Sequence, residues 1–156
     1  MQLSGSRLIS PLCGRRSPGT IFVISDEVYE HINFSQQGHA SVLAHPQLRE
    51  RAVAVSSFGK TYHMTGWKVG YCVAPAPISA EIRKVHQYLT FSVNTRHSWR
   101  LLMLRAEPEH YLALPDFYRE KCDILVNALN ESRLKILPCE GTYFFAGGLQ
   151  RGFYPG

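Results

Sequence analysis

The chain has 156 residues, of which 45% are hydrophobic and 19% are charged, and its formal net charge is +5. This length accommodates one domain of ordinary size, and the composition is typical of a soluble protein. No apolar run reaches the roughly 18 residues that a membrane-spanning helix needs, and the basic N-terminus lacks the apolar stretch of a secretory signal. We therefore expect a cytoplasmic protein that does not bind membranes.

The positive charge is concentrated in a few segments. Residues 1–20 contain three arginines and no acidic residue, and Arg96, Arg100 and Arg151 supply three more positive charges. Since these six charges exceed the surplus of five, the remainder of the chain is close to neutral, which argues against nucleic-acid binding. The four cysteines and seven histidines form no metal-ligand spacing, so we expect free thiols in a reducing compartment and no metal site.

Hydrophobic patterning predicts strands followed by helices, which is typical of an α/β architecture. In chain order we predict a strand at 21–24, a loop at 30–41, a short helix at 45–49, strands at 52–55 and 68–74, helices at 79–90, 99–106 and 108–130 (the last kinked at Pro115), and strands at 134–137 and 142–146. The first two strands are continuous apolar runs, which predicts parallel strands that are buried on both faces. The helix at 79–90 carries Ile82, Val85, His86 and Leu89 at helical spacing on one face.

Polar motifs end the predicted strands of the first part. Residues 25–29 read S-D-E-V-Y, residues 56–62 read S-S-F-G-K-T-Y and residues 65–71 read T-G-W-K-V-G-Y. Polar residues at the carboxyl ends of parallel strands are where α/β sheets place their ligands. We therefore expect one ligand site at this edge of the sheet.

In this order and spacing, the three motifs resemble those of the class I/II aminotransferases, which are fold-type-I pyridoxal-phosphate enzymes. The resemblance is closest to the branch with bacterial methionine aminotransferases and kynurenine aminotransferases. It implies that residues 21–105 form part of the α/β large domain that binds the cofactor, with a mostly parallel sheet and helices. Residues 106–146 would then begin the small C-terminal α+β domain. Residues 1–20 and 147–156 are atypical, and we expect both to lack regular structure.

The resemblance also implies roles for three residues around the cofactor ring. Lys60 would be the catalytic residue, because its amine can form a Schiff base with the aldehyde of pyridoxal 5'-phosphate and then move a proton. Asp26 would pair with the protonated pyridine nitrogen and strengthen the ring's pull on electrons. Tyr29 would donate a hydrogen bond to the phenolic oxygen of the cofactor.

Two further residues would bind the cofactor phosphate. Ser57 and Lys68 offer a hydroxyl and an ammonium group, which suit a dianion. Ser56 or a backbone N–H could replace Ser57 in this role.

The implied reaction exchanges the amino group of an amino acid with a 2-oxo acid, in a homodimer. Methionine and aromatic amino acids are the substrates implied by the resemblance. Two alternatives stay open from the residues alone. One is a C–S lyase or decarboxylase on the same fold, and the other is a non-catalytic remnant or interaction module.

The resemblance breaks at three segments, which are residues 1–20, 96–100 and 145–156. Residues 96–100 read R-H-S-W-R where relatives continue P-A-Q-L-A, and codons for the latter, read one base late, spell the former. We therefore expect frameshifts, which the coding DNA would test. The family chain is more than twice as long and supplies its substrate-carboxylate arginine outside the matching region, so we expect an internal fragment that is inactive by itself.

Overall fold

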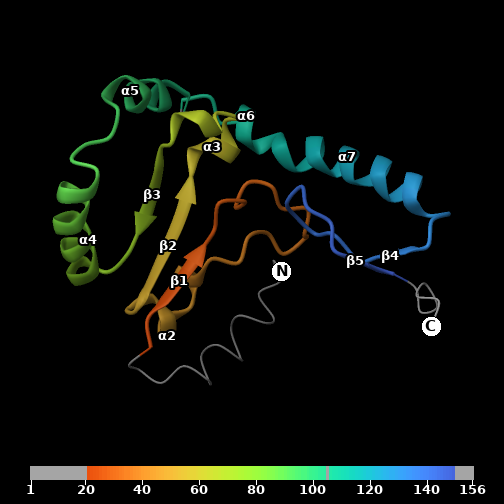
Figure 1. The fold of residues 1–156 in the computed structure, drawn as a ribbon, viewed down its shortest axis with the longest axis horizontal. Coiled ribbons are helices and arrows are strands. Elements are labelled where there is room, and N and C mark those ends of the chain that lie inside the picture. Colours follow the sequence, from red (N-terminus) through yellow and green to blue (C-terminus); the bar gives the residue numbers. More distant parts are fainter. Residues whose placement is uncertain (1–20, 105, 150–156) are drawn as a thin grey trace.

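The computed structural model describes residues 21–104 and 106–149, so that the expectations for residues 1–20 and 150–156 lie outside the described residues. The strands are β1 (Val23–Asp26), β2 (Ala52–Ser57), β3 (Gly70–Val73), β4 (Leu134–Ile136) and β5 (Gly147–Leu149). The helices are α2 (Pro46–Arg49), α3 (Phe58–Thr61), α4 (Ala76–Leu89), α5 (Thr95–Leu104), α6 (Glu109–Leu112) and α7 (Leu114–Leu129), with 3-10 turns η1 (Val42–Ala44) and η2 (Thr65–Trp67). Figure 1 shows a small sheet beside a long helix that reaches away from it.

The main sheet has the strand order β1-β2-β3. β1 and β2 are parallel, as predicted, whereas β3 is antiparallel to β2 and pairs Gly70 with Ser57. The prediction that each motif ends a strand is therefore wrong for residues 65–71, which lead into β3 and include its first two residues. The motif still reaches the expected edge, because the beginning of an antiparallel strand lies beside the end of its neighbour.

Only one face of this sheet is covered within the described residues. Ala52 and Ala54 are buried, and they pack against Val42 of η1 and Leu48 of α2. On the opposite face Ile24 is 78% exposed. The prediction that the strands are buried on both faces is therefore wrong for this part of the chain, although the apolar run itself correctly indicated a strand.

The helices are close to the predicted segments, with two corrections. The segment 108–130 contains two helices, α6 and α7, which break at Ala113 rather than bending at Pro115. Pro115 lies in the first turn of α7, where its missing N–H group removes no intrahelical hydrogen bond and causes no kink. The predicted apolar face of α4 exists, but Val85 and Leu89 are 56% and 81% exposed.

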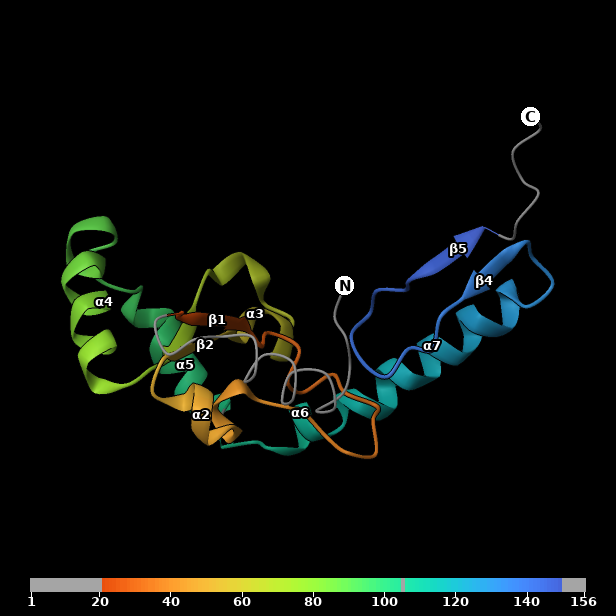
Figure 2. The ribbon, with the colours of Figure 1, turned by 90° about the horizontal axis from the view of Figure 1, so that it is seen from below.

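The C-terminal strands are paired differently from the prediction. β4 forms as predicted, but residues 142–146 are not a strand; instead β5, in the segment predicted to be unstructured, pairs antiparallel with β4. Thr142 has a φ of 66°, which is incompatible with an extended strand at that point. Figure 2 shows α7, β4 and β5 together as a second layer to one side of the main sheet.

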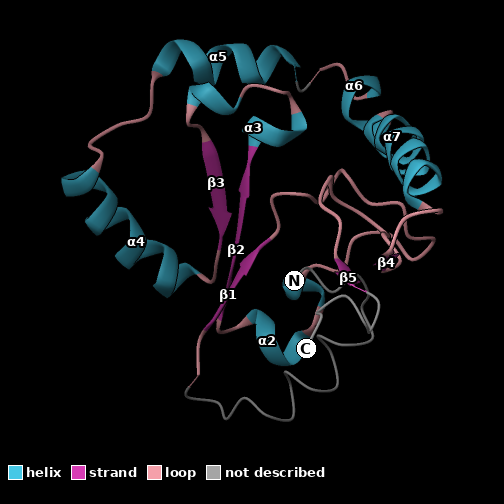
Figure 3. Ribbon diagram, turned by 45° about the vertical axis from the view of Figure 1, so that its right-hand side comes forward, coloured by secondary structure: helices cyan, strands magenta, loops and turns pink. Residues whose placement is uncertain are grey.

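A second core joins this layer to the loop after β1. Ile32 and Phe34 pack against Leu114 at the start of α7. The backbone of Phe34 also donates a hydrogen bond to the carbonyl of Glu140 across 2.7 Å. Residues after β4 are therefore carried back to the edge of the main sheet, as Figure 3 also shows.

No helix in the described ranges has the length and apolar character required to cross a membrane.

Glu27 is a buried carboxylate directly after β1. It accepts hydrogen bonds from His39 Nε2 at 2.9 Å and from the backbone N–H of Val42 at 2.8 Å. Burial raises the pKa of Glu27, but the hydrogen bonds from His39, Val42, Ser41 and Ser25 outweigh burial and leave the pKa below its usual value.

Glu27 should therefore make the stability of the fold depend on pH. Because its pKa is lower in the folded than in the unfolded chain, its contribution is complete above the unfolded value of about 4.3 and is lost as pH falls through the lowered folded value. Glu27→Gln should lower the free energy of unfolding by roughly 1–3 kcal/mol at neutral pH. Urea titrations of both proteins from about pH 6 to about pH 3 should show the difference narrowing toward acid. If the two unfolding free energies differed by the same amount at every pH, the lowered pKa would not belong to Glu27.

Candidate functional site

The position of Lys60 follows from the way β2 turns directly into α3. Ser57 caps this helix, since its hydroxyl accepts a hydrogen bond from the N–H of Gly59 at 3.1 Å. A Cβ atom on Gly59 would lie 2.9 Å from the Cα atom of Thr65, so that only glycine permits this close approach of the two loops. Lys60 is thereby placed one turn beyond the end of a buried strand, at the predicted edge of the sheet.

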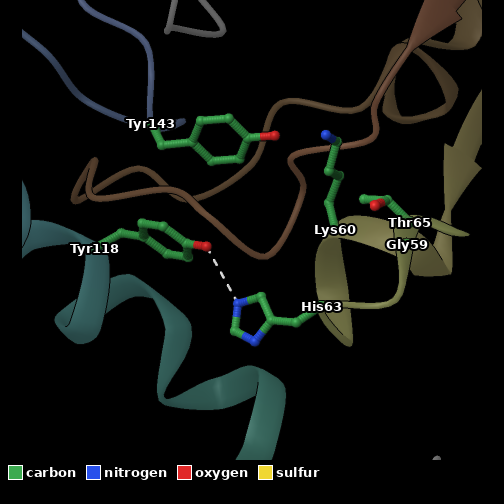
Figure 4. A pocket seen from close by; sticks show the side chains of 6 residues that line it. All are labelled: Gly59, Lys60, His63, Thr65, Tyr118 and Tyr143. Carbon is green, nitrogen blue, oxygen red and sulfur yellow. Dashed lines mark hydrogen bonds between the residues drawn. The ribbon is translucent and has the colours of Figure 1, made fainter.

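A cavity of about 250 Å³ opens beside Lys60. Its lining comes from three separate parts of the chain, as Figure 4 shows: the α3 turn, α7 and the segment after β4. The lining residues are Gly59, Lys60, His63, Thr65, Tyr118 and Tyr143. The cavity therefore depends on the contact between the main sheet and the second layer.

Two phenols and the Lys60 amine meet at one side of this cavity. The hydroxyl of Tyr29 donates a hydrogen bond to the hydroxyl of Tyr143 across 3.2 Å. The Nζ atom of Lys60 lies 5.3 Å from the ring centroid of Tyr143, and Figure 4 shows the amine and the Tyr143 hydroxyl pointing toward one another. The structure thus brings together two predicted site residues, Lys60 and Tyr29, with a third residue that was not predicted.

The pKa values of the two phenols are shifted in opposite directions. Burial raises the pKa of Tyr29, and its hydrogen bond to Tyr143 and the charges of Tyr143 and Asp26 raise it further. Burial also raises the pKa of Tyr143, but hydrogen bonds from Lys60 and Tyr29 and the charge of Lys60 outweigh burial, so that this pKa is lowered overall. Tyr29 therefore keeps its proton as a donor, while the Tyr143 oxygen is the acceptor of the group.

The other predicted residues lie along the same edge with local partners. Asp26 ends β1, is exposed, and accepts a hydrogen bond from the N–H of Val28 at 3.2 Å. The parallel register places Asp26 beside Val55, and Ser57 follows on the same face of the sheet. Lys68 is exposed between η2 and β3, with a φ of 53° in the left-handed region.

Sequence reasoning assigned no role to Tyr118, Tyr143 or His63. Tyr118 lies on α7, and its hydroxyl lies 3.1 Å from Nε2 of His63. Tyr118 and Tyr143 are far from Lys60 in the sequence, so that motif spacing could not place them at the cavity. His63 lies in the turn after Lys60, outside the motif that ends at residue 62. Tyr143 precedes the point, at residue 145, where the family resemblance breaks, which was a usable signal, but its prediction as part of a strand hid it.

The donor set at this edge fits pyridoxal phosphate. A primary amine suits an aldehyde, a protonated phenol suits a phenolate oxygen, and a carboxylate suits a pyridinium nitrogen. Ser57 and Lys68 add a hydroxyl and an ammonium group for a phosphate. Within 21–104 and 106–149, no three His, Cys, Asp or Glu side chains are grouped as metal ligands would be.

Comparison with known proteins identifies the class. Residues 17–152 match the family model of the class I and II aminotransferases, and the chain belongs to this family. Members of the family are fold-type-I enzymes that depend on pyridoxal phosphate. The predicted resemblance and fold class are therefore confirmed, as is the cofactor class.

Individual relatives narrow the comparison. The chain is 92% identical to the methionine aminotransferase of Escherichia coli K12 over 125 residues, which are 80% of this chain and 32% of that protein. It is 36% identical over 142 residues to a kynurenine–oxoglutarate transaminase of Dictyostelium discoideum, covering 89% of this chain and 32% of the relative.

Solved structures of aminotransferases also match this chain. A crystal structure of an Escherichia coli protein with a methionine aminotransferase function matches with a TM-score of 0.76 and 91% identity, over 80% of this chain and 33% of that one. The N-succinyldiaminopimelate aminotransferase of Mycobacterium tuberculosis matches with a TM-score of 0.73 and 32% identity, over 79% of this chain and 32% of that one. This chain therefore spans about a third of the length of the relatives that it matches.

Proposed function

We propose that this chain acts in pyridoxal-phosphate-dependent transfer of an amino group between an amino acid and a 2-oxo acid. The observation that carries the proposal is the position of the Lys60 amine. Lys60 lies in α3, immediately after β2, and lines a cavity beside the phenols of Tyr29 and Tyr143. Family membership supports the same chemistry.

The cofactor supplies an electrophilic aldehyde and a ring that withdraws electrons from a bound amino acid. Lys60 would bind the aldehyde covalently and, as a free amine, carry a proton to and from the substrate α-carbon. Asp26 would hold the proton of the pyridine nitrogen. Tyr29 would donate to the phenolic oxygen, consistent with its raised pKa, which keeps the hydroxyl protonated.

The phosphate would be held at the same edge of the sheet. Ser57 and Lys68 lie at the end of β2 and just before β3, on strands that are direct neighbours. The hydroxyl of Ser57 already caps α3, and it has a second contact to the carbonyl of Val69 at 3.4 Å. A phosphate would replace that long contact with a charge-assisted one.

The substrate we propose is methionine or another amino acid with a side chain of similar size and polarity. Support comes from the 92% identity to a methionine aminotransferase, which is far higher than the 36% identity to the kynurenine–oxoglutarate transaminase. We further propose that the chain acts in the cytoplasm and as part of a homodimer, which are typical of this family.

Reductive trapping tests the proposal. The purified chain is mixed with pyridoxal phosphate and reduced with borohydride, and the modified lysines are mapped by peptide mass. We expect selective labelling of Lys60 over Lys84, whose side chain is 70% exposed on α4 and serves as an internal control. Equal labelling of both lysines would overturn the proposed cofactor site.

A further inference from the structure

The backbone next to Tyr143 is held in place by contacts with the loop after β1, and the proposed reaction assigns Tyr143 no role. The N–H of the preceding Thr142 donates to the carbonyl of Ile32 across 2.8 Å, and Gly141 forms an antiparallel bridge with Asn33. A Cβ atom on Gly141 would lie 2.9 Å from the carbonyl oxygen of Ile32, so that this approach needs glycine.

Thr142 itself is held in a left-handed conformation. Its φ is 66°, it is 8% exposed, and its Oγ1 atom accepts a hydrogen bond from the N–H of Phe144 at 3.1 Å. A β-branched residue rarely adopts this conformation, and its cost persists only where the surroundings enforce it. The bend directs the Tyr143 side chain back to the cavity beside Lys60, as Figure 4 shows.

The Tyr143 ring is packed as well as hydrogen-bonded. It lies edge-on to Tyr29 with ring centroids 5.2 Å apart, and it contacts the ring of Phe144 at 4.8 Å. Its hydroxyl oxygen accepts the hydrogen bond of Tyr29, and the Lys60 amine lies over the same ring. One phenol thus contacts both residues that would act on the reactive side of the cofactor.

We propose that Tyr143 is a positioning residue that holds the Lys60 amine and the Tyr29 hydroxyl together at the cavity. This inference rests on the proposed function for its purpose, but the contacts belong to the chain alone. With Tyr143 accepting from Tyr29 and lying beside the Lys60 amine, Lys60 and Tyr29 are kept at fixed positions relative to one another before a ligand enters. In this role Tyr143 would act through Lys60 and Tyr29.

Four other titratable groups lie at the cavity beside Tyr143. Lys60 comes from α3, Tyr29 from the loop after β1, and Tyr118 from α7, where its ring centroid lies 5.8 Å from that of Tyr143. His63 lines the same cavity but is paired with Tyr118. Because Lys60 and Tyr29 outweigh burial, the Tyr143 phenol should ionise below the usual tyrosine value of about 10.

Competitive acetylation tests this role without any cofactor. Trace acetic anhydride is added across a range of pH, and the rates at Lys60 and Lys84 are compared by peptide mass spectrometry. In the unchanged chain, the Lys60 to Lys84 ratio should show a step where Tyr143 ionises. Tyr143→Phe keeps the ring packing, removes the acceptor, and should abolish the step and change the ratio roughly fivefold, as expected for one hydrogen bond of about 1 kcal/mol.

Tyr29→Phe supplies a second, independent variant. It leaves Tyr143 in place but removes one of the hydrogen bonds that lower its pKa, so that the step should persist and move to higher pH. An unchanged ratio and step in Tyr143→Phe, or an unmoved step in Tyr29→Phe, would overturn the positioning role.

Different results would overturn the cofactor site at Lys60 and the positioning role of Tyr143. If pyridoxal phosphate does not select Lys60 but the acetylation step follows Tyr143, the proposed cofactor site is wrong and the positioning contact stands. If pyridoxal phosphate selects Lys60 equally well in the unchanged chain and in Tyr143→Phe, and the acetylation profiles coincide, the cofactor site stands and Tyr143 has no positioning role.

Discussion

Lys60→Arg is expected to reduce borohydride-trapped pyridoxal phosphate at this position to zero. A guanidinium group keeps its proton at any workable pH, so it cannot attack an aldehyde, yet it retains the positive charge beside Tyr143. The loss of the adduct would therefore report nucleophilicity rather than charge or packing. Total incorporation should fall to the level of scattered surface labelling, measured by mass and by absorbance of the reduced adduct.

Two companion variants make this result specific. Lys84→Arg removes an exposed lysine that pairs with Glu81 at 2.7 Å, and it should leave incorporation at Lys60 unchanged. Lys68→Gln should keep the adduct at Lys60 but require roughly ten to a hundred times more cofactor, since a charge-assisted hydrogen bond to phosphate contributes roughly 1.5–3 kcal/mol. If Lys60→Arg still incorporated the cofactor at the original level, Lys60 would not be the cofactor lysine.

Ile32→Ala is expected to cost about 2–5 kcal/mol of unfolding free energy and to disturb the cavity at the same time. Ile32 is 2% exposed and packs in the core that joins the loop after β1 to α7. Tyr29 packs against this core, and the carbonyl of Ile32 holds the N–H of Thr142, next to Tyr143. Selective trapping at Lys60 should therefore weaken even under conditions where the variant is folded.

Leu48→Ala is the matched control for this change. Leu48 is 1% exposed, but it belongs to the other core, where η1 and α2 cover the sheet. Its loss should lower stability by a similar amount, as measured by urea unfolding, and leave the selectivity for Lys60 intact in the folded protein. Equal effects of both variants on trapping would show that the second core does not organise the cavity.

Much of the site could be predicted from the sequence because its chemistry is local. The motif at residues 56–62 places a short residue, a glycine and a lysine directly after an apolar strand, and the structure has that strand, the Ser57 cap and the Lys60 turn. The parallel register of β1 and β2 brings residues 25–29 to the same edge. Those relations follow from the strand period and from the connection between adjacent elements.

Other features were decided by the tertiary structure alone. The direction of β3 placed Lys68 at this edge although its motif lies at the beginning of the strand rather than at its end. One face of the sheet is exposed in the described residues although the runs are continuously apolar. Tyr118 and Tyr143 reach the cavity only because Ile32 and Phe34 bind the second layer. Such contacts join residues far apart in the chain, and local propensity and periodicity carry no information about them, whereas the role proposed for Lys60 came from the motif in its immediate neighbours.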